Sequence, residues 1–336
     1  MTEANRTDAD AALILAGQVG YLAGVAGRAP SLHNTQPWRF TLSGDAVELH
    51  ADASRQLTID AGGREMLISC GAALYGLRLA VRSLGYLPEV ELLPAHPVPR
   101  PLARVRLGPA APMTAEERKM LVAVPHRHTH RGPFEASPLP PGLFTQLRDD
   151  ARAEGATLTE IAPGPGREEL MALVADSGRR QDRDPRSRAE AWWWSRDVAS
   201  TDRDGVPAHA FRATPGREPD RLPQRDFDLG RGIGLLPAGG PAPAVTAVLF
   251  TTGDSPGDWL RAGQALYRLL LRAASRWVFA GLNTQPLEDA PTRALIADRL
   301  ALPGAPQMLL ALGVSRTARP TARLAADDLI DRDQGP

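Results

Sequence analysis

Apolar side chains recur every three or four residues in several stretches of the chain, which is the spacing of a helix that buries one face. The first predicted helix is capped by Asp10 and ends near Gly27. Two more are predicted from about Glu65 to Leu84 and from about Asp258 to Trp277. Shorter helices are predicted to begin near Pro140 and at Thr114, where a Thr-x-x-Glu pattern matches a capping box.

Strands are predicted where apolar residues alternate with polar ones or form short continuous runs. Alternation on both sides of the turn at 43–45 predicts a hairpin whose second strand is AVELHA. The segment 280–288, AGLNTQPLE, is predicted to be a loop. The mixture of helices and strands indicates an α+β fold. The remaining predicted strands lie near 89–93, 103–107, 157–161, 244–252 and 306–314.

Two of the predicted helices resemble each other at a fixed offset of 192 residues. CGAALYGLRLAVRS, which starts at Cys70, matches AGQALYRLLLRAAS, which starts at Ala262. The 13 positions from Gly71 and Gly263 onward contain seven identities, which include a glycine and a tyrosine. Any two helices rich in Leu and Ala share residues, but the shared Gly and Tyr favour duplication. The chain is therefore predicted to hold two related halves, 1–122 and 123–336, that pair as a pseudo-dimer.

The region 176–240 differs in composition from both halves. It is rich in Arg, Asp, Gly and Pro, and it contains Trp192, Trp193 and Trp194 in succession. Long structured excursions of this kind usually serve a function. Two interpretations stay open: a lid over a binding site, or a surface excursion whose tryptophans pack on their own scaffold.

Charge and cysteine content exclude several classes of protein. The 336 residues include 39 basic and 39 acidic side chains, and this balance argues against a nucleic-acid or membrane-surface binder, which needs a positive field. The single cysteine, Cys70, excludes a disulfide framework. The apolar stretch 11–27 is shorter than the ~20 residues of a membrane span and lacks the basic start of a secretory signal. We therefore expect a cytoplasmic protein without membrane contact.

Three histidines, His126, His128 and His130, alternate along an extended segment and would share one face of a strand. Such a cluster is a candidate metal site, but no cysteine or carboxylate adjoins it, so a solvated polar strand is favoured and no metal is expected. Nor does the chain contain the GxSxG, Walker A, GxGxxG or HExxH patterns, so the corresponding enzyme classes have no support.

The string APSLHNTQPWRF, residues 29–40, is the most specific in the chain. Ser31, Asn34 and Gln36 supply neutral donors and acceptors that could bind the carbonyl and imide edge of a heteroaromatic ring. Alternatively, the same residues would form an ordinary turn that satisfies its own backbone.

This string resembles the flavin-edge loop of the nitroreductase family, whose pattern is APSxxNxQPW. The resemblance implies an α+β flavoprotein that binds FMN between two subunits, with ring contacts from one and phosphate contacts from the other. In this chain Ser31, His33, Asn34 and Gln36 would then bind the flavin ring. The duplicated length and the HNTQPWRF loop are most similar to the Acg subgroup, in which the dimer is intramolecular and a lid covers the flavin.

Three further strings resemble parts of the same family. Arg127, Thr129 and Arg131 match an RxSxR pattern that binds the FMN phosphate, and the chemistry fits because guanidinium groups bind phosphate bidentately. Arg323 occupies the place of a C-terminal basic residue at that phosphate. AGLNTQPLE resembles the loop beside the ring nitrogen that accepts hydride, which would bring Leu287 and Glu288 close to the flavin.

The ring-edge string occurs once, in the first half, and the phosphate string once, in the second. The resemblance therefore implies one FMN per chain, bound between the halves of a monomer, with NAD(P)H as reductant and a nitroaromatic, quinone or related small molecule as acceptor. The flavin would carry the chemistry, so no catalytic side chain is expected. Two alternatives stay open: a flavin-sequestering or redox-sensing protein with little turnover, and a biosynthetic flavin dehydrogenase acting on a specialised metabolite.

Overall fold

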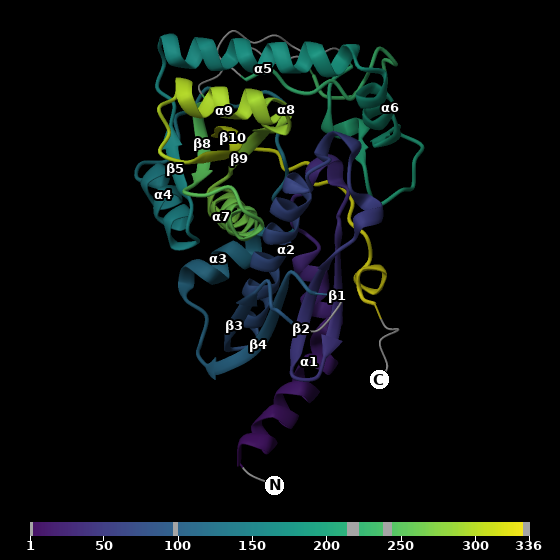
Figure 1. The fold of residues 1–336 in the computed structure, drawn as a ribbon, viewed down its shortest axis with the longest axis vertical. Coiled ribbons are helices and arrows are strands. Elements are labelled where there is room, and N and C mark those ends of the chain that lie inside the picture. Colours follow the sequence, from purple (N-terminus) through teal and green to yellow (C-terminus); the bar gives the residue numbers. More distant parts are fainter. Residues whose placement is uncertain (1–2, 97–99, 214–221, 238–243, 332–336) are drawn as a thin grey trace.

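Two four-stranded antiparallel sheets lie at opposite ends of the molecule (Figure 1). The structure is a computed structural model that describes residues 3–96, 100–213, 222–237 and 244–331. The first sheet has the order β1-β2-β4-β3, and the predicted hairpin is confirmed by pairing from Trp38 opposite Ala51 to Ser43 opposite Ala46. Its strands are β1 (Trp38–Ser43), β2 (Ala46–Ala51), β3 (Tyr86–Leu92) and β4 (Ala103–Ala110).

The second sheet has the order β5-β8-β10-β9, and every neighbouring pair in it is antiparallel. Its central strand β10 is a nearly continuous apolar run because the strand is buried and lies between β8 and β9. With helices against both sheets, the predicted α+β class is confirmed. The strands are β5 (Thr157–Glu160), β8 (Val245–Thr251), β9 (Val278–Asn283) and β10 (Ala305–Val314).

The two helices of the sequence repeat, α2 (Arg64–Ser83) and α7 (Pro256–Ala274), pack against each other between the sheets (Figure 1). They approach most closely at the shared glycines. A Cβ atom on Gly71 would lie 2.2 Å from the carbonyl oxygen of Leu260, and one on Gly263 would lie 2.0 Å from that of Ile68. The contact is thus reciprocal, because each repeat glycine faces the backbone of the other helix.

Other helices cover the sheets and complete three apolar clusters. Thr114 and Glu117 form the predicted capping box at the start of α3. In the part of the chain that the structure describes, no helix is both long and apolar enough to cross a bilayer. These helices are α1 (Glu3–Ala26), α3 (Ala115–Ala123), α4 (Leu143–Ala153) and α9 (Ala290–Arg299), with short 3-10 turns at Leu32–Asn34, Ala53–Arg55, Thr58–Asp60, Ala208–Ala210 and Ala326–Leu329.

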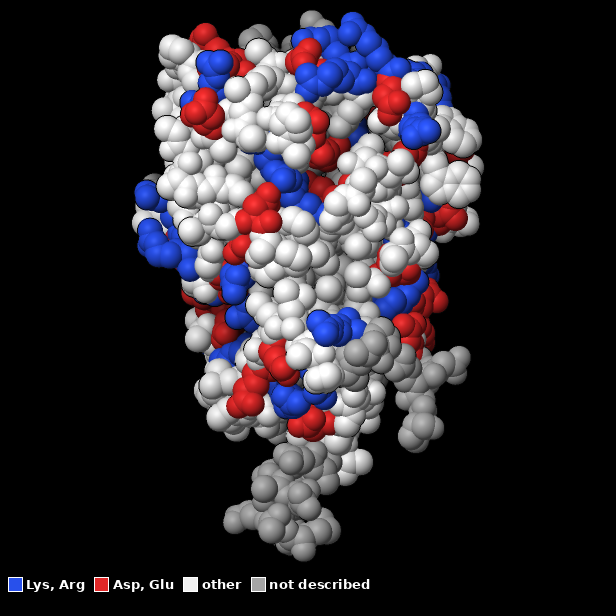
Figure 2. Space-filling model, viewed as in Figure 1, with Lys and Arg blue, Asp and Glu red and all other residues white. Residues whose placement is uncertain are grey.

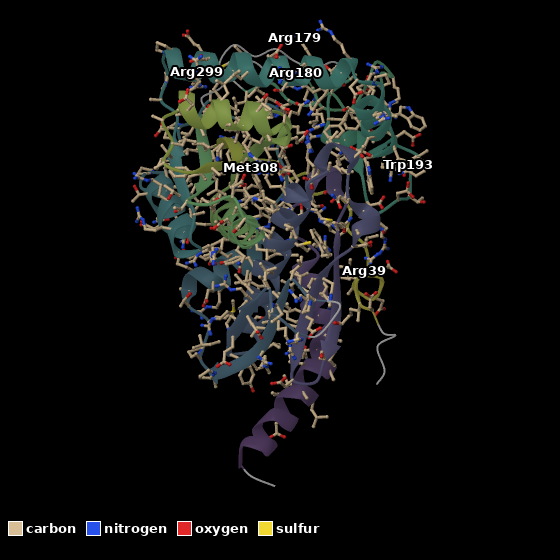
Figure 3. The ribbon with its side chains drawn as sticks, in the orientation of Figure 1. Arg39, Arg179, Arg180, Trp193, Arg299 and Met308 are labelled. Carbon is tan, nitrogen blue, oxygen red and sulfur yellow. The ribbon has the colours of Figure 1, made fainter. Side chains whose placement is uncertain are left out.

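The Trp-rich region forms a layer over one end and one side of the molecule. Helix α5 (Pro165–Arg183) lies across α8 and α9, and α6 (Pro185–Trp193) follows it (Figure 1). The strands β6 (Ser195–Arg196) and β7 (Val206–Pro207) pair in parallel beyond α6. Trp193 is 66% exposed at the outer edge of this layer (Figure 3). Within the predicted insertion, 214–221 and 238–240 lie outside the described residues.

The structure differs from the sequence-based predictions at several elements. Helix α1 begins at Glu3, so Asp10 lies inside the helix and does not cap it. The predicted loop 280–288 was wrong: its first residues belong to β9, and Gln285–Glu288 form the short helix α8. Gly281 and Asn283 are typical of loops, but pairing with β10 makes this segment a strand. Helix α5 begins before position 176, and α9 was not predicted.

Candidate functional site

The loop between α1 and β1 holds three non-glycine residues in the left-handed region of the backbone. His33, Asn34 and Gln36 have φ angles of 50°, 59° and 54°. Each such residue costs of order 1 kcal/mol or more and persists only where its surroundings fix it, most often at binding sites. The loop is therefore held in a specific shape rather than being an unconstrained turn.

Hydrogen bonds show what fixes the loop. The Ser31 hydroxyl accepts a hydrogen bond from the backbone N–H of Gln36 (2.9 Å). The Asn34 side chain donates to the carbonyls of Gly205 (3.0 Å) and Ala322 (3.2 Å). Gln36 donates to the carbonyl of Arg203 (2.9 Å) and accepts from the Leu324 amide (2.9 Å). The two amide side chains thus join this loop to the insertion and to the C-terminal segment.

Two adjoining hollows open beside the loop, and they share Pro30, Ser31, Thr129 and Arg131 in their walls. We call them the smaller hollow, about 300 Å³, and the larger hollow, about 680 Å³. The smaller hollow is lined in addition by Asn34, Val206, Thr321 and Arg323. The structure therefore brings the early string, the middle string and the C-terminal arginine around one space.

Three of the predicted site arginines, Arg127, Arg131 and Arg323, have no acidic partner within the described part of the chain. Among the described residues none of Arg127, Arg131 and Arg323 forms an ion pair, and no carboxylate contributes to their electrostatic environment. Burial lowers the pKa of Arg131 to about 10 and of Arg323 to about 9, and it lowers that of Arg127 as well. Cations removed from water without a counter-ion are strongly destabilising, so the site is complementary to an anion.

Many other arginines among the described residues do pair with a carboxylate. On the face shown in Figure 2, basic residues lie beside acidic ones over much of the surface. At the far end of α2 and α7, Arg268 pairs with Asp150 (2.9 Å) and Glu154 (2.7 Å), and Arg82 pairs with Glu117 (2.8 Å). At the hollows, by contrast, Arg131 and Arg323 have no carboxylate partner among the described residues, and Arg127 beside them has none either.

Arg127 and Arg323 also hold the early loop by its backbone. Arg127 donates to the carbonyl of Arg28 (3.0 Å), and Arg323 donates to that of Ala29 (3.1 Å). The Nε atoms of both guanidinium groups are buried and have no hydrogen-bond partner among the described residues. The side chain of Arg127 does not line either hollow, since it lies beside Tyr267, 5.6 Å from the centre of that ring.

The larger hollow is lined by residues from both sides of position 122 and from the region 176–240. Its apolar walls come from α2, α7, β9 and β10, and Met308 lies deep in the second half (Figure 3). The Phe227 ring packs edge-on against His33, with 5.1 Å between ring centres, and Arg131 lies 5.1 Å from the same phenyl ring. Its lining residues, besides the four shared ones, are Leu32, His33, Glu65, Ile68, Ser69, Gln224, Arg225, Phe227, Leu266, Leu282, Asn283, Thr284, Gln285 and Met308.

His33 is neutral in this setting. Burial lowers its pKa well below the usual value, and the nearby Arg225 and Arg131 lower it further. Both ring nitrogens are buried without a hydrogen-bond partner among the described residues. Its imidazole can therefore donate one hydrogen bond and accept another from a molecule in the hollow.

Besides Arg127, three more of the predicted site residues are absent from the walls of both hollows. Gln36 is fully buried, and its side-chain amide is hydrogen-bonded to the backbone of Arg203 and Leu324. It therefore holds the loop in place and does not line a hollow. Leu287 packs in the apolar cluster beneath α5 and α9. The carboxylate of Glu288 is bound by Arg225, Thr284 and Gln181. The segment does pass the larger hollow, but through Asn283, Thr284 and Gln285, because β9 ends there.

Individual residues of α2 and of the insertion line the larger hollow without having been predicted, although the insertion as a whole was a candidate lid. Glu65 and Ser69 line the larger hollow from the first turns of α2, and Arg225 and Phe227 line it from the insertion. The only signal for Glu65 and Ser69 was a polar side chain on an otherwise apolar helix. No sequence pattern distinguished Arg225 and Phe227 within the insertion.

Comparison with known proteins identifies the family. A protein of Mycobacterium tuberculosis named "Putative NAD(P)H nitroreductase" is 33% identical to this chain over 292 residues, which cover 85% of this chain and 82% of the relative. The chain belongs to this nitroreductase family. A second relative from that organism, named in the same way with the addition Acg, is 31% identical over 290 residues, 86% of each chain. The resemblance inferred from the sequence is thereby confirmed.

Two further proteins are similar to this nitroreductase at lower sequence identity. An uncharacterized protein of Mycobacterium tuberculosis is 28% identical over 325 residues, 92% of this chain and 91% of the relative. A solved nitroreductase of Desulfitobacterium hafniense with bound FMN is 12% identical, with a TM-score of 0.37 over 67% of this chain and 98% of that one. No family model matches the chain.

Proposed function

We propose that this nitroreductase binds one FMN between its two halves and uses it to transfer electrons from NAD(P)H to a small acceptor. The observation that carries the proposal is the set of unpaired arginines at a hollow walled by both halves and by the early loop. A phosphate would supply the missing anion at one end, and a planar ring system would occupy the larger hollow.

The residues present fit FMN. Arg131, Arg323 and the Thr129 hydroxyl offer charged and neutral donors for a phosphate at the smaller hollow. At the larger hollow, His33 and Ser31 offer donors and acceptors, while Phe227 and the aliphatic side chains offer apolar contact for ring faces. When bound, FMN would accept a hydride equivalent from a nicotinamide and deliver it to an acceptor.

The protein's own contribution would be binding, orientation and exclusion of water. Arg131 and Arg323 would neutralise the phosphate, and the strained loop from Ser31 to Gln36 would fix the edge of the ring. Arg127 would act indirectly, because it holds the loop through the carbonyl of Arg28. As the two halves already meet within one chain, we propose that the monomer is sufficient.

A flavin-sequestering role is the second candidate, and one observation favours it. The insertion is joined to the early loop by the bonds from Asn34 to Gly205 and from Gln36 to Arg203, and its Phe227 and Arg225 line the larger hollow. An insertion held in this way would restrict access of a nicotinamide to the ring.

Anaerobic mixing of the purified holoprotein with NADPH, and separately with NADH, tests the proposal. Rapid bleaching of the flavin absorbance, followed by recovery with a quinone or nitroaromatic, is expected for the reductase. Flavin colour that persists with both nicotinamides but bleaches with dithionite would support sequestration instead. Bleaching only by an organic donor would favour a dehydrogenase. Protein that carries no flavin and takes up none would contradict all three functions.

A further inference from the structure

Glu65 is a buried carboxyl group that faces the larger hollow. It lies in the first turn of α2 and is only 2% exposed, yet it is part of the hollow's wall. Its Oε1 contacts the guanidinium group of Arg64, the preceding residue. Within the described part of the chain, no hydrogen bond reaches the second oxygen, Oε2. One carboxyl oxygen is therefore free to interact with a molecule in the hollow.

The groups around Glu65 include both signs of charge. Asp60 caps the start of α2 by accepting hydrogen bonds from the amides of Glu65 (3.1 Å) and Met66 (2.8 Å). Glu288 of α8 lies on another side, where it is paired with Arg225 of the insertion. The guanidinium group of Arg64 contacts Gln307 as well as Glu65, because it also donates to the side chain (2.8 Å) and the backbone carbonyl (3.1 Å) of Gln307.

The balance favours the neutral acid. Burial raises the pKa of Glu65 to about 8, and the carboxylates of Glu288 and Asp60 raise it as well, whereas Arg64 and Arg225 oppose the change. The carboxyl group is therefore mostly protonated at neutral pH. Among the described residues that line the larger hollow, it is the one carboxyl group, while the imidazole of His33 is neutral.

We infer that Glu65 is the proton donor to the acceptor that this nitroreductase reduces. The inference rests on the proposed function, which supplies the hydride. A quinone-type acceptor gains a hydride, with its two electrons, at one end of its conjugated system, and the other oxygen must gain a proton to give the hydroquinone. Glu65 breaks its O–H bond to supply that proton, and its carboxylate then pairs with Arg64 until solvent returns a proton.

The test compares two oxidants of the reduced holoprotein. A benzoquinone requires a proton with its hydride, whereas ferricyanide takes single electrons and requires none. Reduced wild-type protein and Glu65→Gln are mixed with each oxidant from pH 6 to 10. For the wild type, the quinone rate should fall about tenfold per pH unit above pH 8, because the donor loses its proton. Glu65→Gln should be about 10²-fold slower with quinone near pH 7 and lack this pH break.

Measured per bound FMN, ferricyanide oxidation and reduction by a nicotinamide should lose far less rate in Glu65→Gln than quinone reduction does. Glu65→Asp keeps an acid and should retain the pH break with an intermediate rate. Glu168→Gln, an exposed substitution on α5, is the matched control and should behave as wild type. In FMN-free protein, the infrared carbonyl band of a neutral carboxylic acid should titrate near pH 8 and be absent from Glu65→Gln.

The possible outcomes distinguish failure of the role assigned to Glu65 from failure of the proposed function. If the holoprotein forms and is reduced, but the quinone rate of Glu65→Gln keeps the wild-type size and pH dependence, Glu65 is not the donor and the proposed function stands. Equal losses with ferricyanide and quinone would also overturn the assignment, since they would indicate a general structural effect. If the protein binds no FMN, the proposed function fails and the inference with it.

Discussion

At the scale of single residues, the two arginines that line the hollows affect both the stability of the protein and its affinity for an anion. Arg131 and Arg323 have lowered pKa values because they are partly removed from water and no carboxylate among the described residues offsets this. Such groups make the empty protein less stable than it would be with apolar side chains of the same size. An anion that binds between them recovers this free energy, so binding and folding are coupled there.

Replacing one of these arginines should change protein stability and FMN affinity in opposite directions. Arg131→Met should raise the free energy of unfolding of FMN-free protein by about 1–3 kcal/mol and weaken FMN binding about 10- to 100-fold, as expected for one charged hydrogen bond. Urea unfolding and fluorescence titration measure the two effects. Arg82→Met, which removes a buried arginine with a carboxylate partner, should lower stability instead. A less stable Arg131→Met protein with unchanged FMN affinity would contradict the anion site.

The buried histidines should make the fold sensitive to mild acid. Burial lowers the pKa of His128 to about 3 and lowers that of His33 well below 6.5. At these two positions the unfolded chain takes up protons that the folded chain does not. The histidines therefore lower stability as pH drops below about 6.5, by up to ~1.4 kcal/mol per pH unit for each group, whereas the raised pKa of Glu65 contributes with the opposite sign. His128→Gln should make the fall between pH 6.5 and 5 less steep. The exposed His96→Gln should not, and an unchanged slope in His128→Gln would contradict the assignment.

At the scale of secondary-structure elements, the reciprocal glycine contact between α2 and α7 is what two helices related by a two-fold axis would show. Gly71 faces the backbone of Leu260, and Gly263 faces that of Ile68, at the crossing of the two repeat helices. We propose that the repeat marks a duplicated unit whose two copies pair through these helices. The crossing also fixes the hollows, because Glu65 and Ser69 project from α2 and Leu266 from α7.

Substitution at the crossing should be severe. Gly263→Ala would place a methyl group 2.0 Å from a backbone oxygen, which cannot rotate away, so the helices must separate. We expect a loss of at least ~1–3 kcal/mol of unfolding free energy in urea. Gly17 is an exposed position on α1, and nothing would lie within 4 Å of a methyl group there. Gly17→Ala should therefore be neutral or stabilising by up to ~1 kcal/mol. Equal effects of the two substitutions would mean that the crossing is not tight.

The sequence predicted elements with strong periodicity better than elements fixed by tertiary contacts. The repeat helices, the hairpin and the capping box at Thr114 follow from local patterns. The second part of strand β9 was predicted as a loop because Gly281 and Asn283 are poor strand formers, and pairing with β10 makes them part of a strand. The same holds for the site. Ser31 and Arg131 were found through their motifs, whereas Glu65 and Phe227 meet them only after folding.

At the scale of the whole molecule, the hollows form where two halves and an insertion converge. The insertion is held to the first half by Arg55, which pairs with Asp204 (3.0 Å), and by Glu190, which accepts a hydrogen bond from the Ile59 amide (3.2 Å). Asp204 also pairs with Arg196 (2.8 Å) within the insertion. We propose that these contacts limit how often the insertion opens.

Loosening the insertion should therefore increase access to the site. Asp204→Ala removes both ion pairs and should increase the rate of NADPH oxidation by the holoprotein and the rate of proteolytic cleavage near positions 197–204. Asp202→Ala, which removes only a pair between Arg196 and a mostly exposed carboxylate, is the control and should change neither. Faster cleavage without faster reduction would mean that the insertion does not limit access.

Titration of FMN-free protein with FMN and with riboflavin tests the central claim most directly. Riboflavin has the same ring system but lacks the phosphate. If the early loop binds the ring while Arg131 and Arg323 bind the phosphate, fluorescence quenching should end at one FMN per chain, and riboflavin should bind at least about 100-fold more weakly. Equal affinity for the two flavins, or no binding of either, would contradict a site shared between the halves.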